Sequence, residues 1–184
     1  MCEGETERNY FLGMKEDEDF KQALSAVNPQ VVKAKNPTPE QVLKEATGRV
    51  EKALRENNPY DSVWLVFDHD NHEHRETAFD QAKKEGFHVA FSAIAFETWF
   101  LMHFAKSARA FQNAEELIKT LRKYYANYEK ANQNDFDNLK QRLETGMENA
   151  EWLRSQKSSP HQHLTDCNPW TDVDVLVKEL LEMK

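Results

Sequence analysis

The sequence of 184 residues is poor in the features that mark secreted, fibrous and membrane-spanning proteins. Two cysteines are too few for a disulfide framework and fit a reducing cytoplasm. Five glycines and six prolines exclude collagen-like and low-complexity chains. The longest apolar run has five residues, Val63 to Phe67, so we expect no transmembrane helix. The N-terminus also lacks the basic start and apolar stretch of a signal peptide. We therefore expect a cytoplasmic protein with no membrane contact.

Positive charge is scarce as well. Lysine and arginine number 24 against 32 aspartates and glutamates, which gives a net charge of −8. This balance argues against a protein that binds nucleic acid through bulk electrostatic attraction. It does not exclude an enzyme that handles phosphodiesters through metal ions.

The first half of the chain has the alternating pattern of an α/β fold. Gln30–Ala34 is a candidate strand, and Thr38 is placed to cap a helix that begins at Pro39, with Gln41 in the capping-box position. The continuously apolar segment Ser62–Phe67 is typical of a central parallel strand that is covered on both faces. A helix near residues 77–84, a strand at 87–92 and a helix at 96–104 follow. Strands and helices in this order predict a parallel sheet with right-handed crossovers.

The second half is predicted to be helical. Apolar residues recur at helical spacing in two stripes, which suggests a helical hairpin, and a last helix follows Asn168–Thr171. We expect an α/β domain over residues 1–106 and a helical appendage over 107–184, packed together as one compact unit. The stripes consist of Leu117, Leu121, Tyr124, Tyr125 and Tyr128, and of Phe136, Leu139, Leu143, Met147 and Ala150.

A pair of carboxylates follows the best strand. Asp68 and Asp70 leave it at positions i and i+2, so their side chains point roughly the same way. Ligands of parallel sheets bind at the carboxyl ends of the strands. Such a pair can share Mg²⁺, which prefers oxygen ligands and keeps positions for water and phosphate. Helix capping with solvent exposure is the alternative explanation of this pair.

Two further acidic features are candidates. Glu3, Glu5 and Glu7 cluster around Gly4 near a helix start, where Glu5 and Glu7 could simply complement the helix dipole. Glu97 lies within a strongly apolar helix, and a charged residue in that setting needs a partner or a function.

Four sequence blocks, taken in order, resemble the RloB/AbiLii family, which is associated with abortive infection and restriction loci in bacteria. The blocks cover most of the chain, and the ordered set is specific although each block alone is weak. They are Cys2-Glu3-Gly4-Glu5-Thr6-Glu7 with Tyr10-Phe11, Val66-Phe67-Asp68 with Asp70, Ser92 with Phe96-Glu97, Trp99-Phe100-Leu101 and His103-Phe104, and Asn168-Pro169 with Thr171.

The resemblance implies a Toprim-like fold, since the first half of that family is similar to Toprim domains. Those domains hold Mg²⁺ at a phosphodiester with a glutamate after the first strand and a D-x-D after a later one. The resemblance maps these ligands to Glu3, Asp68 and Asp70 and implies a phage-defence nuclease that uses Mg²⁺ or Mn²⁺. It also implies DNA or tRNA as substrate, a partner ATPase from the same locus, and a homo-oligomer as one assembly. Glu97 is a family-specific addition, and a third metal-directed acid is one interpretation of it.

The sequence departs from the family at two places. The loop after Ser92 lacks the usual Asn-Pro, and the apolar strand that normally precedes Cys2 is absent. We therefore expect that the chain starts upstream, or that the sheet is rearranged or completed by another chain. A non-catalytic regulatory subunit of a defence complex is the alternative function. A phosphatase of the haloacid dehalogenase type is a weaker one, because Asn71 and the late position of Asp68 do not fit its nucleophile motif.

Overall fold

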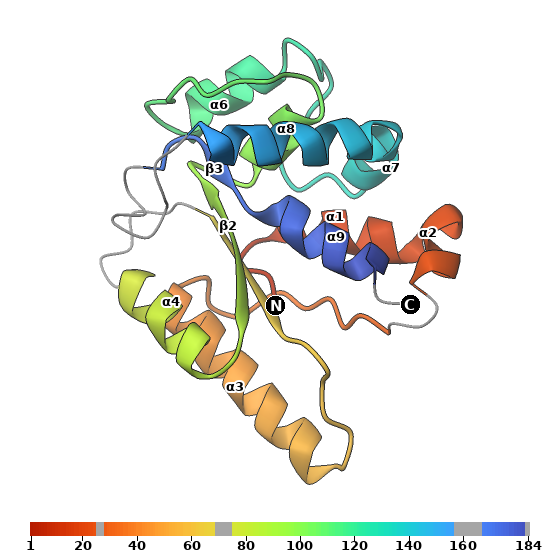
Figure 1. Ribbon diagram of the computed structural model, residues 1–184, viewed down its shortest axis with the longest axis vertical. Coiled ribbons are helices and arrows are strands. Elements are labelled where there is room, and N and C mark those ends of the chain that lie inside the picture. Colours follow the sequence, from red (N-terminus) through yellow and green to blue (C-terminus); the bar gives the residue numbers. More distant parts are fainter. Residues whose placement is uncertain (25–27, 69–74, 157–166, 183–184) are drawn as a thin grey trace.

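The computed structural model describes residues 1–24, 28–68, 75–156 and 167–182. In chain order it places helices on both sides of a small sheet (Figure 1). The strands are β1 (Trp64–Asp68), β2 (His88–Ala93) and β3 (Trp170–Thr171). The helices are α1 (Glu5–Glu16), α2 (Glu18–Ala23), α3 (Pro39–Arg55), α4 (Arg75–Lys84), α5 (Glu97–Met102), α6 (Ala114–Leu121), α7 (Asp135–Leu139), the 3₁₀ helix η1 (Lys140–Arg142), α8 (Leu143–Ser155) and α9 (Val173–Glu182). The predicted mixed α/β class is confirmed.

The sheet has the order β1-β2-β3. Strands β1 and β2 are parallel, with Trp64 opposite His88 and Asp68 opposite Ser92, as the crossover through α4 predicted. Strand β3 is antiparallel to β2, which the sequence pattern did not predict. The sheet is therefore mixed rather than wholly parallel. Two residues are too few to show an alternating pattern, so β3 is recognisable only from its pairing.

Residues 1–3 lie beside β1. Cys2 forms parallel bridges with Lys33 on one side and Val66 on the other. The Val66 amide donates to the Met1 carbonyl at 2.9 Å, and the Cys2 amide donates to the Val32 carbonyl at 2.7 Å. The candidate strand at 30–34 thus forms only this bridge. The segment before α1 takes a place within the sheet, between residue 33 and β1.

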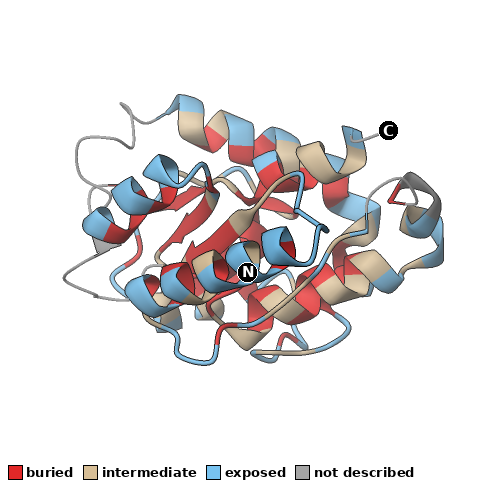
Figure 2. Cartoon of the chain, turned by 90° about the horizontal axis from the view of Figure 1, so that it is seen from below, coloured by how far each residue is buried: buried red, intermediate tan, exposed pale blue. Residues whose placement is uncertain are grey.

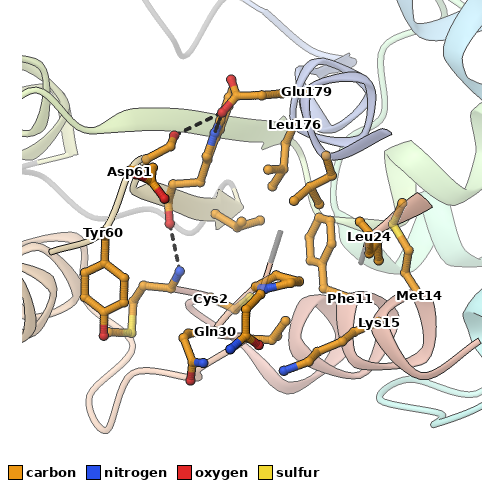
Figure 3. A pocket seen from close by; sticks show the side chains of 18 of the residues that line it. Cys2, Phe11, Met14, Lys15, Leu24, Gln30, Tyr60, Asp61, Leu176 and Glu179 are labelled. Carbon is orange, nitrogen blue, oxygen red and sulfur yellow. Dashed lines mark hydrogen bonds between the residues drawn. The ribbon is translucent and has the colours of Figure 1, made fainter. Parts of the chain in front are cut away.

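A cavity of about 720 Å³ lies at the N-terminal side of this bridge (Figure 3). Its apolar wall includes Phe11 and Met14 of α1, Trp64 of β1 and Leu176 of α9. On its rim, Glu179 accepts hydrogen bonds from the Ser62 hydroxyl at 3.0 Å and from the Trp64 indole at 2.9 Å. The cavity is therefore apolar with a polar rim, and neither Glu3 nor Asp68 lines it.

The two faces of the sheet pack into two apolar cores, because successive side chains of a strand point to opposite faces. Leu65 and Phe67 face a core formed with α3 and α4. Val66 and Ala90 face a larger core formed with the other helices. Figure 2 shows the buried strands between helices whose outer sides are exposed. Strand β1 is therefore covered on both faces, as predicted, although it stands first in the strand order and only the bridge from Cys2 lies at its other edge.

Helix α3 begins as the sequence predicted. The Thr38 hydroxyl accepts from the Gln41 amide at 3.4 Å, and Pro39 occupies the first turn. Gly86, after α4, adopts a φ of +77°, a left-handed conformation that favours glycine at a helix end. No helix in the described part of the chain is long and apolar enough to cross a membrane.

The helices after residue 107 share the larger core with α1 and α5. Leu117 and Leu121 of α6 and Leu139 of α7 are buried in the same cluster as Phe100 of α5. The first predicted stripe is helical only as far as Leu121, and Tyr124 beyond it is 53% exposed. The predicted division at residue 106 therefore lies within one continuous core. The helical hairpin takes the form of α6 followed by α7, η1 and α8.

Candidate functional site

The carboxyl end of β1 brings together two residues that are far apart in sequence. The Asp68 amide donates a hydrogen bond to Glu3 Oε2 at 3.2 Å. The Glu3 amide in turn donates to the Val66 carbonyl at 3.0 Å, so the pairing of residues 1–3 with β1 fixes the position of Glu3. Glu3 is buried and Asp68 is half-buried. Asp70, the other predicted ligand, lies outside the described residues.

Glu7 is a third acid at this place. It lies one helical turn after Glu3, and burial is the main cause that raises its pKa to about 8, with the charge of Asp68 second among the raising effects. Its carboxylate packs against Gly4, where a Cβ atom would lie 2.5 Å from Glu7 Oε2. Gly4 thus permits this close approach. No sequence signal marked Glu7 for this site, because Glu3 precedes α1 and the two residues do not share a helix face.

Glu97 is fully buried at the start of α5. The Tyr128 hydroxyl donates to Glu97 Oε1 at 2.6 Å, whereas Oε2 has no hydrogen-bond partner among the described residues. The charge of Glu97 also contributes to the raised pKa of Glu7. The partner that the apolar setting of Glu97 required is therefore a tyrosine, which supplies no positive charge.

Asp135 extends the group of acids toward the helical half. The Tyr125 hydroxyl donates to Asp135 Oδ1 at 2.9 Å. Burial raises the pKa of Asp135 to about 6, with a further contribution from the charge of Glu97, against the lowering effect of the Tyr125 hydrogen bond. We call Glu3, Glu7, Asp68, Glu97 and Asp135 the acidic cluster.

The donors of the acidic cluster have the chemistry that Mg²⁺ requires, because all of them are carboxylate oxygens. Burial is the main cause of the raised pKa of Glu7, and the charges of Asp68 and Glu97 add to it. Within the described ranges, no group of three or more histidines, cysteines, aspartates and glutamates is arranged to hold a metal ion. The structure brings Glu3 and Asp68, two of the three residues predicted as ligands, together through one hydrogen bond, and their carboxylate oxygens match a divalent cation in donor type.

Comparison with known proteins adds one finding. A family model described as RloB-like protein matches residues 1–180. The chain belongs to the RloB-like family. Searches of curated proteins and of solved structures found no match. The RloB-like match spans the acidic cluster and α9, so the family predicted from four short blocks is confirmed over nearly the whole chain.

Proposed function

We propose that this RloB-like protein is a metal-dependent nuclease of the Toprim type that cleaves DNA or RNA phosphodiesters. One observation carries the proposal: buried Glu3 and Glu7 gather with Asp68 at the carboxyl end of a central parallel strand. Open parallel sheets bind ligands at this end. The pKa of Glu7 is raised to about 8, mainly by burial, and a strongly perturbed carboxyl group beside another acid is typical of functional sites.

Glu3, Asp68 and Asp70 would hold the cation, Mg²⁺ or Mn²⁺. When bound, such a cation stabilises the negative charge that develops on a phosphodiester during cleavage. Glu3 is oriented by its hydrogen bond from the Asp68 amide. Glu7 has a pKa of about 8 before a cation binds, and once a cation has displaced its proton its carboxylate would be suited to accept a proton at a nearby oxygen atom.

The proposed biological setting is phage defence. The blocks around Glu3, Asp68 and Glu97 resemble proteins of abortive-infection loci, and this resemblance supports a cytoplasmic effector with a partner ATPase. The substrate would be DNA or tRNA. A homo-oligomer is one form that the effector could take.

A second function has an observation in its favour. Across the described ranges no three side chains are arranged to hold a metal ion, which suits a binding or regulatory subunit of a defence complex that has lost metal chemistry. Such a subunit would act by contact with nucleic acid or with its partner and would leave phosphodiesters intact.

Cleavage assays separate the two functions. Full-length protein, with and without the partner ATPase, is incubated with labelled DNA and tRNA in Mg²⁺ or Mn²⁺. The nuclease proposal predicts cation-dependent products that Asp68→Ala and Asp70→Ala abolish and that Asp61→Ala, an exposed acid before β1, leaves unchanged. Undiminished cleavage by both site variants would remove Asp68 and Asp70 from the mechanism. Absence of products under all of these conditions would favour the regulatory subunit.

A further inference from the structure

The charge of the protein is distributed unevenly along the chain. Residues 106–142 contain eight lysines and arginines against five aspartates and glutamates, a net charge of +3. The other residues therefore have a net charge of −11, which together with +3 gives the total of −8. Among the described residues, Arg122, Lys123 and Arg142 are exposed and form no salt bridge with an acidic side chain. Within the described part of the chain, these three side chains thus carry positive charge that no acidic side chain pairs with.

An exposed aromatic ring lies among these cations. Tyr124 follows α6, and its side chain is 53% exposed. This is a high exposed fraction for a large aromatic residue. Its ring stacks on Phe104, with centroids 6.2 Å apart and planes inclined by 18°. The Arg142 guanidinium lies 5.2 Å from the centre of the same Phe104 ring. Phe104 therefore supports Tyr124 in a fixed orientation. We call Tyr124, Phe104 and Arg142 the aromatic platform.

Contacts between neighbouring aromatic rings connect the aromatic platform to the acidic cluster. Phe104 lies 6.1 Å from Tyr125, and Tyr125 lies 5.7 Å from Tyr128. The hydroxyl groups of these two tyrosines donate to Asp135 and Glu97. Lys130 lies near the cluster as well, because its charge lowers the pKa of Glu7. The aromatic platform is therefore connected to the acidic cluster through packed side chains, of which Tyr128, Glu97 and Asp135 are buried.

We infer that the aromatic platform binds single-stranded nucleic acid, with an unpaired base stacked on Tyr124 and phosphates held by Arg122, Lys123 and Arg142. The inference rests on the proposed function, which it deepens by naming the substrate class. An exposed aromatic ring stacks on any unpaired base, whereas the bases of a duplex already stack on each other. Positive charge beside the ring complements the phosphate backbone. The predicted arrangement is one base and its flanking phosphates per protein.

The test measures binding without turnover. Fluorescence anisotropy of a labelled single-stranded oligonucleotide, and of the duplex of the same sequence, is followed in excess EDTA with full-length protein. We expect the single strand to bind more tightly than the duplex. Tyr124→Ala is expected to weaken single-strand binding about 5- to 150-fold, the range for loss of one stacked base. Tyr124→Trp is expected to retain it.

Two controls make the test specific. Tyr60→Ala changes another tyrosine, which is 42% exposed and lies by the apolar cavity, and is expected to leave binding unchanged. Circular dichroism checks that each variant is folded. Arg122→Gln with Lys123→Gln is expected to reduce the salt dependence of binding, because fewer counterions are released.

Several outcomes would overturn the inference. These are equal binding by Tyr124→Ala and wild type, equal affinity for duplex and single strand, and no binding of either. Binding of the partner ATPase but of no nucleic acid, with that binding lost in Tyr124→Ala, would show that the platform docks a protein instead. The binding assay contains no free divalent cation, so it does not depend on cleavage. A wild-type protein that cleaves nothing could still bind the single strand. The two proposals therefore fail separately.

Discussion

Replacement of Glu7 by glutamine isolates the energetic cost of a buried carboxylate. The pKa of Glu7 is raised from 4.5 to about 8, mainly by burial. The folded protein therefore binds a proton that the unfolded chain releases, and its stability falls as the pH rises from about 4.5 to about 8. With these two pKa values, the loss of unfolding free energy between pH 5 and pH 9 is about 4 kcal/mol. Relaxation of the folded state makes this an upper value, and roughly 2–4 kcal/mol is expected.

The assay is urea denaturation followed by circular dichroism across that pH range, in EDTA so that no cation binds. In Glu7→Gln the titrating group is gone, so the difference in unfolding free energy between variant and wild type should grow with pH by this amount. Glu5→Gln is the matched control, because Glu5 lies in the same helical turn but is partly exposed and paired with Lys33. Its difference from wild type should stay constant above about pH 6, well above the lowered pKa of Glu5. Parallel pH curves for Glu7→Gln and wild type would refute the reasoning.

Three further substitutions probe neighbouring contacts. Gly4→Ala places a Cβ atom 2.5 Å from Glu7 Oε2, at a backbone conformation that alanine tolerates. The variant should fold, and calorimetry should show roughly tenfold weaker Mn²⁺ binding, equivalent to about 1.4 kcal/mol. Gly48→Ala, where nothing lies within 4 Å, should bind normally, and equal affinity of the two variants would contradict the role of Gly4. Tyr128→Phe removes the hydroxyl that donates to Glu97 and should lower the free energy of unfolding by about 1–3 kcal/mol in urea denaturation. If the loss is as small as in the control variant Tyr60→Phe, Glu97 does not need this hydrogen bond. Arg154→Met leaves buried Asp174 with only the more distant Lys178, at 3.8 Å, and should cost about 3 kcal/mol, the low end for breaking a buried pair. Loss of less than about 1 kcal/mol, the range of an exposed pair such as Lys178–Glu151, would contradict that estimate.

Local signals accounted for the parts of the fold that were predicted. The continuous apolar run before Asp68 identified β1, because only a strand covered on both faces needs apolar side chains at every position. Thr38, Pro39 and Gln41 identified the start of α3, since capping depends on residues within one turn. The last helix, α9, followed from apolar residues at helical spacing.

Features that depend on distant parts of the chain were not predicted. Strand β3 exists because Thr171 and Trp170 pair with β2, about eighty residues earlier. The tyrosines after Leu121 continue the helical spacing, but the helix ends at Leu121. Tyr128 instead donates a hydrogen bond to Glu97. Glu7 was explained by the helix dipole, and its burial beside Asp68 follows only from the pairing of residues 1–3 with β1.

The prediction of the site was partial for the same reason. Order along the chain suggested that Glu3 and Asp68 belong to one site, and the structure brings them together. The Toprim-like identity, the metal and the place of Asp70 stay predictions. What the structure adds is Glu7, a carboxyl group whose pKa is raised by burial and by the charges of Asp68 and Glu97.

The central claim is that the carboxylates at the end of β1 hold a divalent cation. Titration calorimetry with Mg²⁺ and Mn²⁺ at neutral pH, in two buffers of different ionisation enthalpy, measures both the affinity and the protons released. At pH 7, Glu7 with a pKa of about 8 is roughly nine-tenths protonated, so cation binding should release about one proton. Asp68→Asn should abolish binding, and Glu7→Gln should abolish the proton release. Absence of binding at millimolar cation, or binding that Asp68→Asn does not change, would contradict the claim.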